Sequence, residues 1–354
     1  MNNGELKNIL VIRYRRVGDS ILAMALCRTL KMNFPEARID LVLDANIAPL
    51  FENHPDVDRV IAFTHEEKHR FFHYLAKVRQ VVRSTRYDAI IDMRSTIQTL
   101  WFSLFSIRTK YRIGRKKSYN WLVSNYRPKI SKNIDMVVQD LMLARPLQKI
   151  KPIHECREFS MPVSETEKMA FRSYMERNGV DFNRPVVFCA VATRIPWKVW
   201  DKERMKAVLR LIIERYDACL IFNYGGDEER RYVEMLYNEM DCDSHIAFGV
   251  EAKGLPQLKA MLANCDFFFG NEGGPRHLAQ ALGVPSFAIY PPHISKTVWL
   301  PSNGGMHQGI EVADIESSRL LDKKADYAER FALVTVEEVW NRLAPHADHY
   351  LKKQ

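Results

Sequence analysis

The sequence predicts an α/β protein built from two Rossmann-like domains, and three observations support this fold class. The 354 residues exceed what one hydrophobic core usually organises, so two domains of ordinary size are expected. Short apolar runs of strand length alternate with helical stretches in both halves, which indicates βαβ units and parallel sheets. A polar, proline-containing stretch from 149 to about 183 interrupts this series, as is typical of a domain boundary.

The elements follow from apolar runs and their periodicity. The predicted strands of the first half are Asn8–Arg13, Ile39–Leu43, Val60–Phe63 and Tyr87–Met93, and those of the second half are Pro185–Ala190, Ala218–Asn223, Asp266–Gly270 and Ser286–Tyr290. The predicted helices include Ile21–Leu30, Lys202–Arg215 and the amphipathic Val336–Leu351. Open parallel sheets bind ligands at the carboxyl ends of their strands. The loops after Arg13, Ala190, Phe222 and Phe269 are therefore the candidate sites.

Composition is typical of a folded, soluble protein, with 47% hydrophobic and 27% charged residues. The six cysteines are scattered without a C-x-x-C pair, which favours free thiols in a reducing compartment. The start of the chain lacks the pattern of a signal peptide. No apolar run approaches the roughly 18 residues that span a bilayer. We therefore expect a cytoplasmic protein.

The net charge of +9 is concentrated in the first half of the chain. Residues 1–150 contain 26 Lys and Arg against 14 Asp and Glu, while the remainder contains 26 against 29. This asymmetry indicates an anionic partner for the first half, such as nucleic acid, a phosphorylated glycan or a membrane surface. A solvated basic face without a ligand is the alternative.

An aromatic segment, Trp101–Ile107, precedes a stretch from 108 to 117 with six basic residues. This pattern fits contact with an anionic leaflet. It fits equally well a buried helix followed by a basic loop, or a site for an anionic acceptor.

The first candidate loop contains three arginines, Arg13, Arg15 and Arg16, followed by Gly18 and Asp19. Glycine permits a tight turn, and a carboxylate is favoured at the start of the following helix. Asp19 by itself would more simply be a helix cap. The neighbouring arginines indicate instead a carboxylate that works beside an anionic substrate.

A second candidate is the turn Gly270–Leu278, which follows an apolar strand and opens a helix. Its adjacent glycines, Gly273 and Gly274, let backbone amides approach a phosphate closely. Pro275 suits the first turn of a helix. A purely steric glycine-rich bend is the alternative.

Two further loops supply charged groups at the same sheet edge. In Thr193–Trp200, a lysine between two tryptophans could neutralise phosphate as a point charge, although Trp200 favours packing. In Asn223–Arg230, acidic residues at a helix start could bind ribose hydroxyls or cap the helix.

Metal-binding letter patterns also occur, and their contexts argue against metal sites. Asp56–Asp58 precedes its strand and Asp241–Asp243 ends a helix, so neither fits the D-x-D of a metal-dependent transferase. His65–His69 matches H-E-x-x-H, but the segment is strongly polar and no glutamate follows until Glu155. We expect solvated helical faces and no metal.

In this order and spacing, the motifs resemble glycosyltransferase family 9, the bacterial heptosyltransferases of lipopolysaccharide core synthesis. The matching segments are Gly18-Asp19, Lys198-Val199-Trp200, Gly225–Glu229 and Glu272–His277, and the resemblance extends from Ile9 to about Pro301.

The resemblance implies the GT-B architecture, in which two Rossmann-like domains face each other across a cleft. It implies an acceptor-binding domain at 1–165, a nucleotide-sugar-binding domain at 166–335, and a C-terminal helix at 336–354 that packs back on the N-terminal domain. The implied reaction is transfer with inversion, with Asp19 as the catalytic base. The donor would be ADP-heptose or a related nucleotide-sugar, without a cofactor, and the acceptor an anionic glycolipid rather than nucleic acid. The protein would act in the cytoplasm, with peripheral contact to the inner face of the inner membrane.

The same resemblance implies the roles of individual side chains. Donor-binding residues would be Thr193, Lys198, Glu229, Glu272, Gly273, Gly274 and His277, and acceptor-binding residues would be Arg13, Arg15, Arg16, Arg94 and Arg115.

The sequence departs from the family pattern at three places. Glu272 replaces an aspartate and Gly273 replaces a hydroxyl residue, which favours a different nucleotide-sugar donor as the first alternative. Asp201 replaces a proline at a helix start. A non-catalytic protein that binds an anionic ligand is the second alternative.

Overall fold

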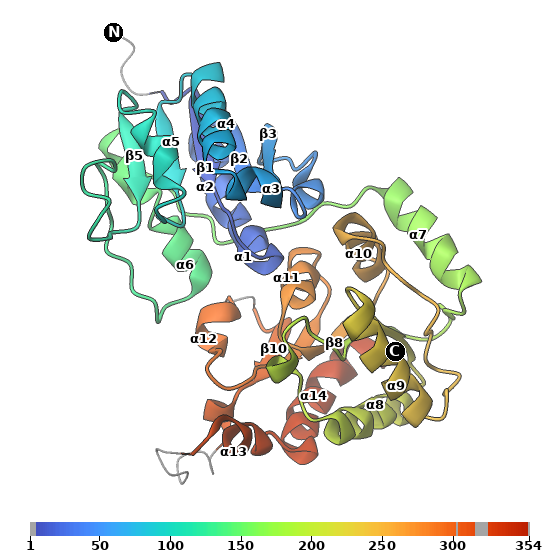
Figure 1. The fold of residues 1–354 in the computed structure, drawn as a ribbon. Helices are drawn as coiled ribbons and strands as arrows, with labels where there is room; N and C mark the ends of the chain where they lie inside the picture. Colours follow the sequence, from blue (N-terminus) through green and yellow to red (C-terminus); the bar gives the residue numbers. More distant parts are fainter. Residues whose placement is uncertain (1–4, 302–303, 316–324, 353–354) are drawn as a thin grey trace. The chain divides into compact units, whose positions relative to one another are not determined.

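The computed structural model describes residues 5–301, 304–315 and 325–352. The chain forms two compact units, Met1–Met161 and Pro162–Gln354, which are coloured along the sequence in Figure 1. The division lies four residues before the end of the N-terminal domain expected from the sequence.

The N-terminal unit is a parallel five-stranded sheet with helices on its faces. Its elements are β1 Asn8–Ile12, α1 Val17–Leu22, α2 Met24–Asn33, β2 Arg38–Asp44, η1 Ala48–Phe51, β3 Arg59–Phe63, α3 His65–His69, α4 Phe71–Ser84, β4 Ala89–Asp92, α5 Leu100–Leu104, β5 Tyr111–Gly114, α6 Met136–Leu141 and η2 Arg145–Lys149. The strand order is β3-β2-β1-β4-β5. Since the chain moves outward from β1 to β3 and then returns beside β1 as β4, the switch point lies between β1 and β4.

The C-terminal unit repeats this plan. Its elements are α7 Glu165–Arg177, β6 Val186–Ala190, η3 Pro196–Lys198, α8 Lys202–Tyr216, β7 Cys219–Phe222, α9 Asp227–Glu239, α10 Leu255–Leu262, β8 Phe267–Asn271, α11 Gly274–Ala281, β9 Ser286–Ile289, α12 Lys296–Trp299, β10 His307–Ile310, η4 Val312–Asp314, α13 Tyr327–Ala332 and α14 Val336–Leu351. The strand order is β10-β9-β8-β6-β7, so the switch point lies between β6 and β8. The two loops with the most unusual chemistry in this half, those after β6 and β8, therefore begin side by side.

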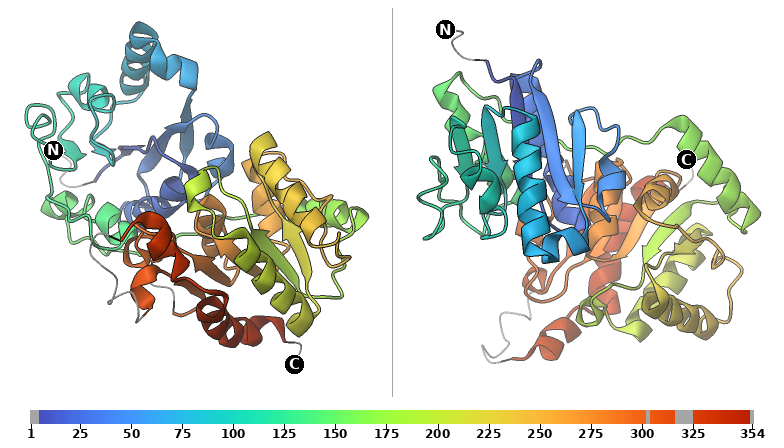
Figure 2. Two further views of the ribbon diagram at one scale, coloured as in Figure 1. Left: turned by 60° about the horizontal axis from the view of Figure 1, so that its bottom comes forward. Right: turned by 45° about the horizontal axis from the view of Figure 1, so that its top comes forward.

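Apolar side chains on both sides of each sheet hold these layers together. In the N-terminal unit, α4 buries Tyr74, Val78 and Val82 against strand residues that include Leu10 and Ile90. Figure 2 shows α4 lying along the face of this sheet. Burial of apolar area of this kind is the main favourable term in folding.

The C-terminal helix α14 belongs to the core of the C-terminal unit. Its buried residues Val339, Leu343 and Ala347 pack in one cluster with residues of β6, β7 and α8, and the helix contacts α8, β8, β9 and β10. The expectation that this helix also packs back on the N-terminal domain stays a prediction. Its apolar stripe is buried by the sheet of its own unit.

Three local features differ from the sequence-based expectations. The short strands β5 and β10, four residues each at the sheet edges, were not predicted because their runs are brief and interrupted by polar residues. The first helix is divided at Ala23 into α1 and α2 and begins at Val17 rather than Ile21.

Among the described residues, no helix combines the length and apolarity needed to cross a membrane.

Candidate functional site

The first constellation lies where β1 passes into α1. Asp19 is in the first turn of α1 and is buried. Its Oδ1 lies 3.0 Å from Nη1 of Arg15 and 3.4 Å from Nη2 of Arg13, and Nε of Arg13 donates to the Asp19 carbonyl at 3.2 Å. The Asp19 side chain does not cap the helix. The simple helix-cap interpretation is therefore wrong, and the carboxylate is held between two guanidinium groups.

A second carboxylate, which the sequence reasoning missed, joins two of the predicted arginines. Asp140 of α6 is fully buried, with Oδ2 at 3.3 Å from Nη2 of Arg13 and Oδ1 at 2.7 Å from Nη2 of Arg115. Arg115 also donates to the Gln139 side chain at 2.9 Å. Burial raises the pKa of Asp140, and the two arginines oppose that rise. The only signal in the sequence was an acid in a strongly basic stretch.

The remaining predicted arginines lie near this group but differ in their contacts. Arg94 donates to the Tyr14 carbonyl at 2.5 Å, and burial together with Arg15 and Arg13 lowers its pKa. Arg16 is exposed, and its side chain has no ion-pair partner among the described residues. At the carboxyl edge of this sheet, Asp140 thus joins Arg13 to Arg115, and Arg13 and Arg15 both pair with Asp19. Arg94 lies near these arginines.

The corresponding edge of the C-terminal unit is built on close approach of β6 and β8. Gly270 has φ +134°, and a Cβ there would lie 2.5 Å from the Ala190 carbonyl oxygen, so only glycine fits. The next side chain, Asn271, is buried, donates to the Ala190 and Val191 carbonyls at 2.9 and 3.0 Å, and accepts from the Trp200 amide at 2.8 Å. Asn271 therefore fixes the loop after β6 against the loop after β8, a role the sequence did not reveal.

These two loops bring together Lys198, Glu272 and His277. Glu272 is 5% exposed. Its Oε2 lies 2.9 Å from Nζ of Lys198, and its Oε1 lies 3.7 Å from Nε2 of His277. Burial would raise the pKa of Glu272, but His277 and Lys198 outweigh it and hold the pKa at about 2. The cluster contains a cation, a carboxylate and an imidazole at the topological switch point.

The turn between Glu272 and His277 opens α11. Gly273 is the N-cap residue with extended backbone, and Gly274 and Pro275 form the first helical positions, as the sequence predicts for this proline. The helix start leaves backbone amides without helical partners. The buried Arg276 donates to the Trp299 carbonyl at 2.6 Å and also contacts the His277 ring. Arg276 therefore fixes the imidazole in place beside Glu272.

Two predicted donor-binding residues, Thr193 and Glu229, make local contacts. Oγ1 of Thr193 donates to the Ile195 carbonyl at 2.7 Å, so the hydroxyl shapes its own turn. Glu229, in the first turn of α9, accepts from the Gly225 amide at 2.8 Å. Burial raises the pKa of Glu229, opposed by the Gly225 amide and by Arg194. This carboxylate lies after β7, one strand away from the Lys198 cluster.

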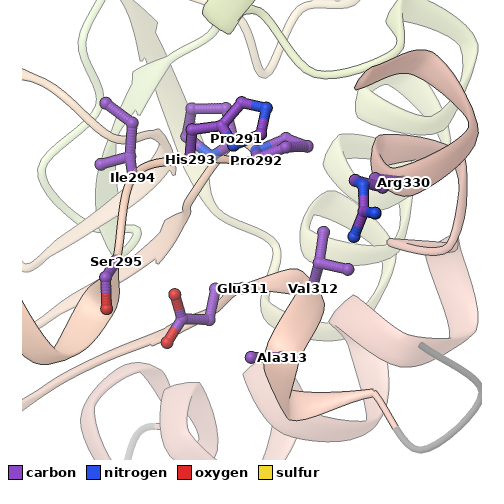
Figure 3. Close-up of a pocket in the computed structure, with 9 residues that line it drawn as sticks. All are labelled: Pro291, Pro292, His293, Ile294, Ser295, Glu311, Val312, Ala313 and Arg330. Carbon is purple, nitrogen blue, oxygen red and sulfur yellow. The ribbon is translucent and has the colours of Figure 1, made fainter. Parts of the chain in front are cut away.

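A pocket of about 350 Å³ lies beyond the ends of β9 and β10 (Figure 3). Its walls are mostly apolar, with the Glu311 carboxylate and the Arg330 guanidinium at separate positions around it. The Tyr327 hydroxyl donates to the Trp197 carbonyl at 2.7 Å, and its ring centroid lies 6.0 Å from that of His293. Since His293 lines the pocket, these contacts join the pocket wall to the loop that carries Lys198.

The carboxylates of the discounted metal patterns have structural partners. Asp58 pairs with Lys31 at 2.9 Å and accepts from the Ile39 amide at 2.7 Å. Glu67 forms a capping box with Thr64 and pairs with Lys77 at 2.7 Å. These groups stabilise strand and helix ends.

Comparison with known proteins gives consistent results. A family model described as "Glycosyltransferase family 9 (heptosyltransferase)" matches residues 75–304. The chain is 23% identical to lipopolysaccharide heptosyltransferase 3 of Escherichia coli over 316 residues, which cover 82% of this chain and 85% of that protein.

Two solved structures share the fold. A glycosyltransferase family 9 protein from Veillonella parvula has a TM-score of 0.81 at 18% identity, with 97% of each chain covered. The ADP-heptose lipopolysaccharide heptosyltransferase II of E. coli has a TM-score of 0.72 at 22% identity, with 96% of this chain and 98% of that chain covered. The predicted fold class, two Rossmann-like domains of GT-B type, is confirmed.

Proposed function

This chain belongs to glycosyltransferase family 9, the heptosyltransferases, and from that membership we propose that it transfers a heptose from ADP-heptose to a lipopolysaccharide core or similar glycolipid, in the cytoplasm. The donor and acceptor are those in the names of its E. coli relatives. The chain is a glycosyltransferase, so the non-catalytic alternative is not supported. The observation that carries the proposal is the pairing of Lys198, Glu272 and His277 at the switch point of a nucleotide-binding type of sheet.

The donor would bind at the loops after β6 and β8. In the transition state, positive charge develops on the sugar ring while the departing nucleoside diphosphate gathers negative charge. The Lys198 ammonium and the amides at Gly273 and Gly274 would stabilise that leaving group, since donors placed in advance need no reorganisation. The Glu272 carboxylate, kept ionised by its neighbours, would face the sugar. Glu229 would accept from the ribose hydroxyls, and Thr193 would shape the loop through its bond to Ile195.

The acceptor would bind beside the Asp19 constellation of the N-terminal unit. Asp19 would take the proton of the acceptor hydroxyl while the hydroxyl oxygen forms a bond to the anomeric carbon. The bond from that carbon to the diphosphate oxygen breaks, ADP leaves with the electron pair, and the anomeric configuration inverts. Arg15, Arg16 and Arg94 would contact anionic groups of the acceptor, while Arg13 and Arg115, both bonded to Asp140, would hold the site in shape. No metal or further cofactor is part of this proposal.

Asp19→Asn tests the catalytic assignment. We expect turnover to fall about 10³-fold, within the usual range for loss of a general base, while ADP binding measured by calorimetry is unchanged. Asp44→Asn is the matched control, because Asp44 ends β2 at the same sheet edge and pairs with Lys68; it should keep wild-type turnover. Wild-type turnover in Asp19→Asn would refute the assignment.

A different nucleotide-sugar donor is the second candidate, favoured by Glu272 and Gly273 in place of the family's aspartate and hydroxyl residue. A thermal-shift panel of ADP-, UDP- and GDP-sugars separates the two. Stabilisation by UDP- or GDP-sugars, without an effect of ADP-sugars, would replace ADP-heptose in the proposal while leaving the enzyme class intact.

A further inference from the structure

Arg13 connects the Asp19 constellation to a carboxylate on a different helix. Its Nη2 lies 3.4 Å from Oδ1 of Asp19 and 3.3 Å from Oδ2 of Asp140. One guanidinium nitrogen therefore serves two carboxylates, which come from α1 and α6 of the same unit (Figure 1). Through this nitrogen, the charge state of Asp140 can act on Asp19.

Burial fixes this shared contact and strengthens it. Arg13 is 1% exposed and Asp140 is fully buried, so the pair is shielded from water and little screened by salt. Within the described chain, Oδ2 of Asp140 has no hydrogen-bond partner, which leaves the ion pair with Arg13 to balance it. Nε of Arg13 donates to the Asp19 carbonyl at 3.2 Å, and Nη2 of Arg115 lies 2.7 Å from Oδ1 of Asp140. Both ends of the connection are therefore held in place.

Asp19 faces more cations than one carboxylate balances. Besides Arg13, the Arg15 guanidinium lies 3.0 Å from its Oδ1, and Arg94 is close enough to interact with both arginines and with Asp19. A carboxylate among cations holds its ionised form strongly and accepts a proton poorly. A general base has to accept a proton in the transition state. Negative charge beside these arginines would therefore help Asp19 to act as a base.

Asp140 supplies negative charge at this place. Burial raises the pKa of Asp140, its two arginine partners oppose the rise, and Asp19 adds to it. Since the interaction between two charges is mutual, the Asp140 carboxylate makes it easier for Asp19 to accept a proton. Asp44, another carboxylate at this sheet edge, interacts with Arg94 and pairs with Lys68 instead.

We propose that Asp140 is a positioning residue for the transfer reaction, which acts through Arg13 and keeps the Asp19 carboxylate able to accept a proton. By engaging Nη2 of Arg13, it prevents that guanidinium from pairing with Asp19 alone. Asp140 has this role only if Asp19 is the base of the proposed function. In a purely structural role, Asp140 would neutralise Arg13 and Arg115 without any effect on Asp19.

The coupling can be measured without substrate, by carbon NMR of the full chain labelled at its aspartate carboxyl carbons. The Asp19 signal is assigned by its loss in Asp19→Asn, and its titration is compared between the wild type and Asp140→Asn. This substitution removes the charge and keeps the size of the side chain. We expect Asp19 to titrate at a pH lower by at least about half a unit in Asp140→Asn. Asp44→Asn is the matched control and should shift it far less, because Asp44 pairs with Lys68.

Turnover tests the consequence for the reaction. With ADP-heptose, or the donor that the thermal-shift panel identifies, Asp140→Asn should lower kcat about threefold or more, because a weaker base removes the proton more slowly. The KM for the donor should not change, and the acid limb of the pH–rate profile should move to lower pH together with the Asp19 titration. Asp140→Glu keeps the charge and should keep the wild-type profile, even where its extra methylene lowers stability.

Circular dichroism establishes that each variant is folded. If Asp140→Asn does not fold, Asp140→Asn combined with Arg115→Gln takes its place, since it also removes one of the two cations left unpaired; Asp19 should then titrate at a lower pH than in Arg115→Gln alone.

Three outcomes would overturn the proposal. An unchanged Asp19 titration in Asp140→Asn, with turnover lost in Asp19→Asn, would refute the role of Asp140 alone. A lower kcat in Asp140→Asn with an unchanged pH profile would show a purely structural role. Wild-type turnover in Asp19→Asn would remove the proposed base, and the role of Asp140 with it.

Discussion

Replacing Glu272 by glutamine perturbs the centre of the candidate donor site by one charge. Glu272 has a pKa of about 2 against an ordinary value of 4.5, because His277 and Lys198 outweigh the effect of its burial. The difference corresponds to about 3 kcal/mol of folding free energy when the carboxyl is ionised. Loss of the carboxylate also leaves Lys198, whose side chain is 12% exposed, without its partner, and breaking a buried pair costs about the same amount.

The sign of the pH dependence follows from the lowered pKa. The stabilisation by Glu272 is complete above pH 4.5, the ordinary value, and is lost as the pH falls through 4.5 towards 2. Urea unfolding should therefore show wild type and Glu272→Gln separated by about 3 kcal/mol at neutral pH, with a clearly smaller separation near the acid end of this window. To follow the C-terminal unit alone, Trp101→Phe and Trp121→Phe would be introduced into both the wild type and the Glu272→Gln variant. The fluorescence then comes from the four tryptophans of the C-terminal unit.

Glu229→Gln is the matched control for this experiment. It is the same substitution at a partly buried carboxyl of the same unit, but burial raises the pKa of Glu229. Neutralising it should therefore not lower stability at neutral pH. Lys198→Met added to Glu272→Gln should recover part of the loss, because no charge is then left unpaired. A separation that stays constant with pH, or an equal loss in Glu229→Gln, would refute the reasoning.

Two further predictions concern buried strand residues, Asp92 of β4 and Gly270 of β8. Burial raises the pKa of Asp92 from 3.8 to about 6. Ionising this carboxyl in the folded protein therefore costs free energy, and the cost grows as the pH rises from 3.8 through 6. Asp92→Asn should stabilise the protein against urea by up to about 3 kcal/mol at neutral pH and by very little near pH 4. Stabilisation that does not change with pH would contradict this assignment. Gly270→Ala should lower stability by about 3 kcal/mol or more in thermal melts, because its Cβ would meet the Ala190 carbonyl. Gly249→Ala is the control and should cost little, since the nearest atom to its Cβ would lie at 3.8 Å. Equal melting temperatures of the two variants would show that β6 and β8 can move apart at little cost.

Much of the fold could be predicted from local patterns in the chain. Apolar runs, their periodicity and the glycines and proline after Phe269 are visible in the sequence, because strand, helix and turn preferences act over a few residues. These patterns predicted eight of the ten strands found in the described residues, and the loops that carry Asp19, Lys198 and Glu272. The edge strands β5 and β10 were missed because polar residues or glycine interrupt their short runs, YRIG and HQGI.

The charged contacts of the candidate sites could be predicted only in part. An arginine-rich loop indicates an anionic ligand, but not that Asp140 pairs with Arg13 and Arg115. The low pKa of Glu272 depends on His277 of the same turn and also on Lys198, which a distant segment contributes. The ring contact between Phe71 and Trp101 likewise joins two different helices and could not be read from the sequence.

The sequence by itself determined that this is a two-domain α/β protein of the family 9 type, and which loops carry its unusual chemistry. Only the tertiary structure decided which of those loops meet, because strand order depends on pairing between segments far apart in the chain. Lys198 and Glu272 are 74 residues apart and become neighbours only because β6 and β8 pair. For the same reason, the apolar stripe of α14 predicted burial, while the sheet that buries it was decided by the fold.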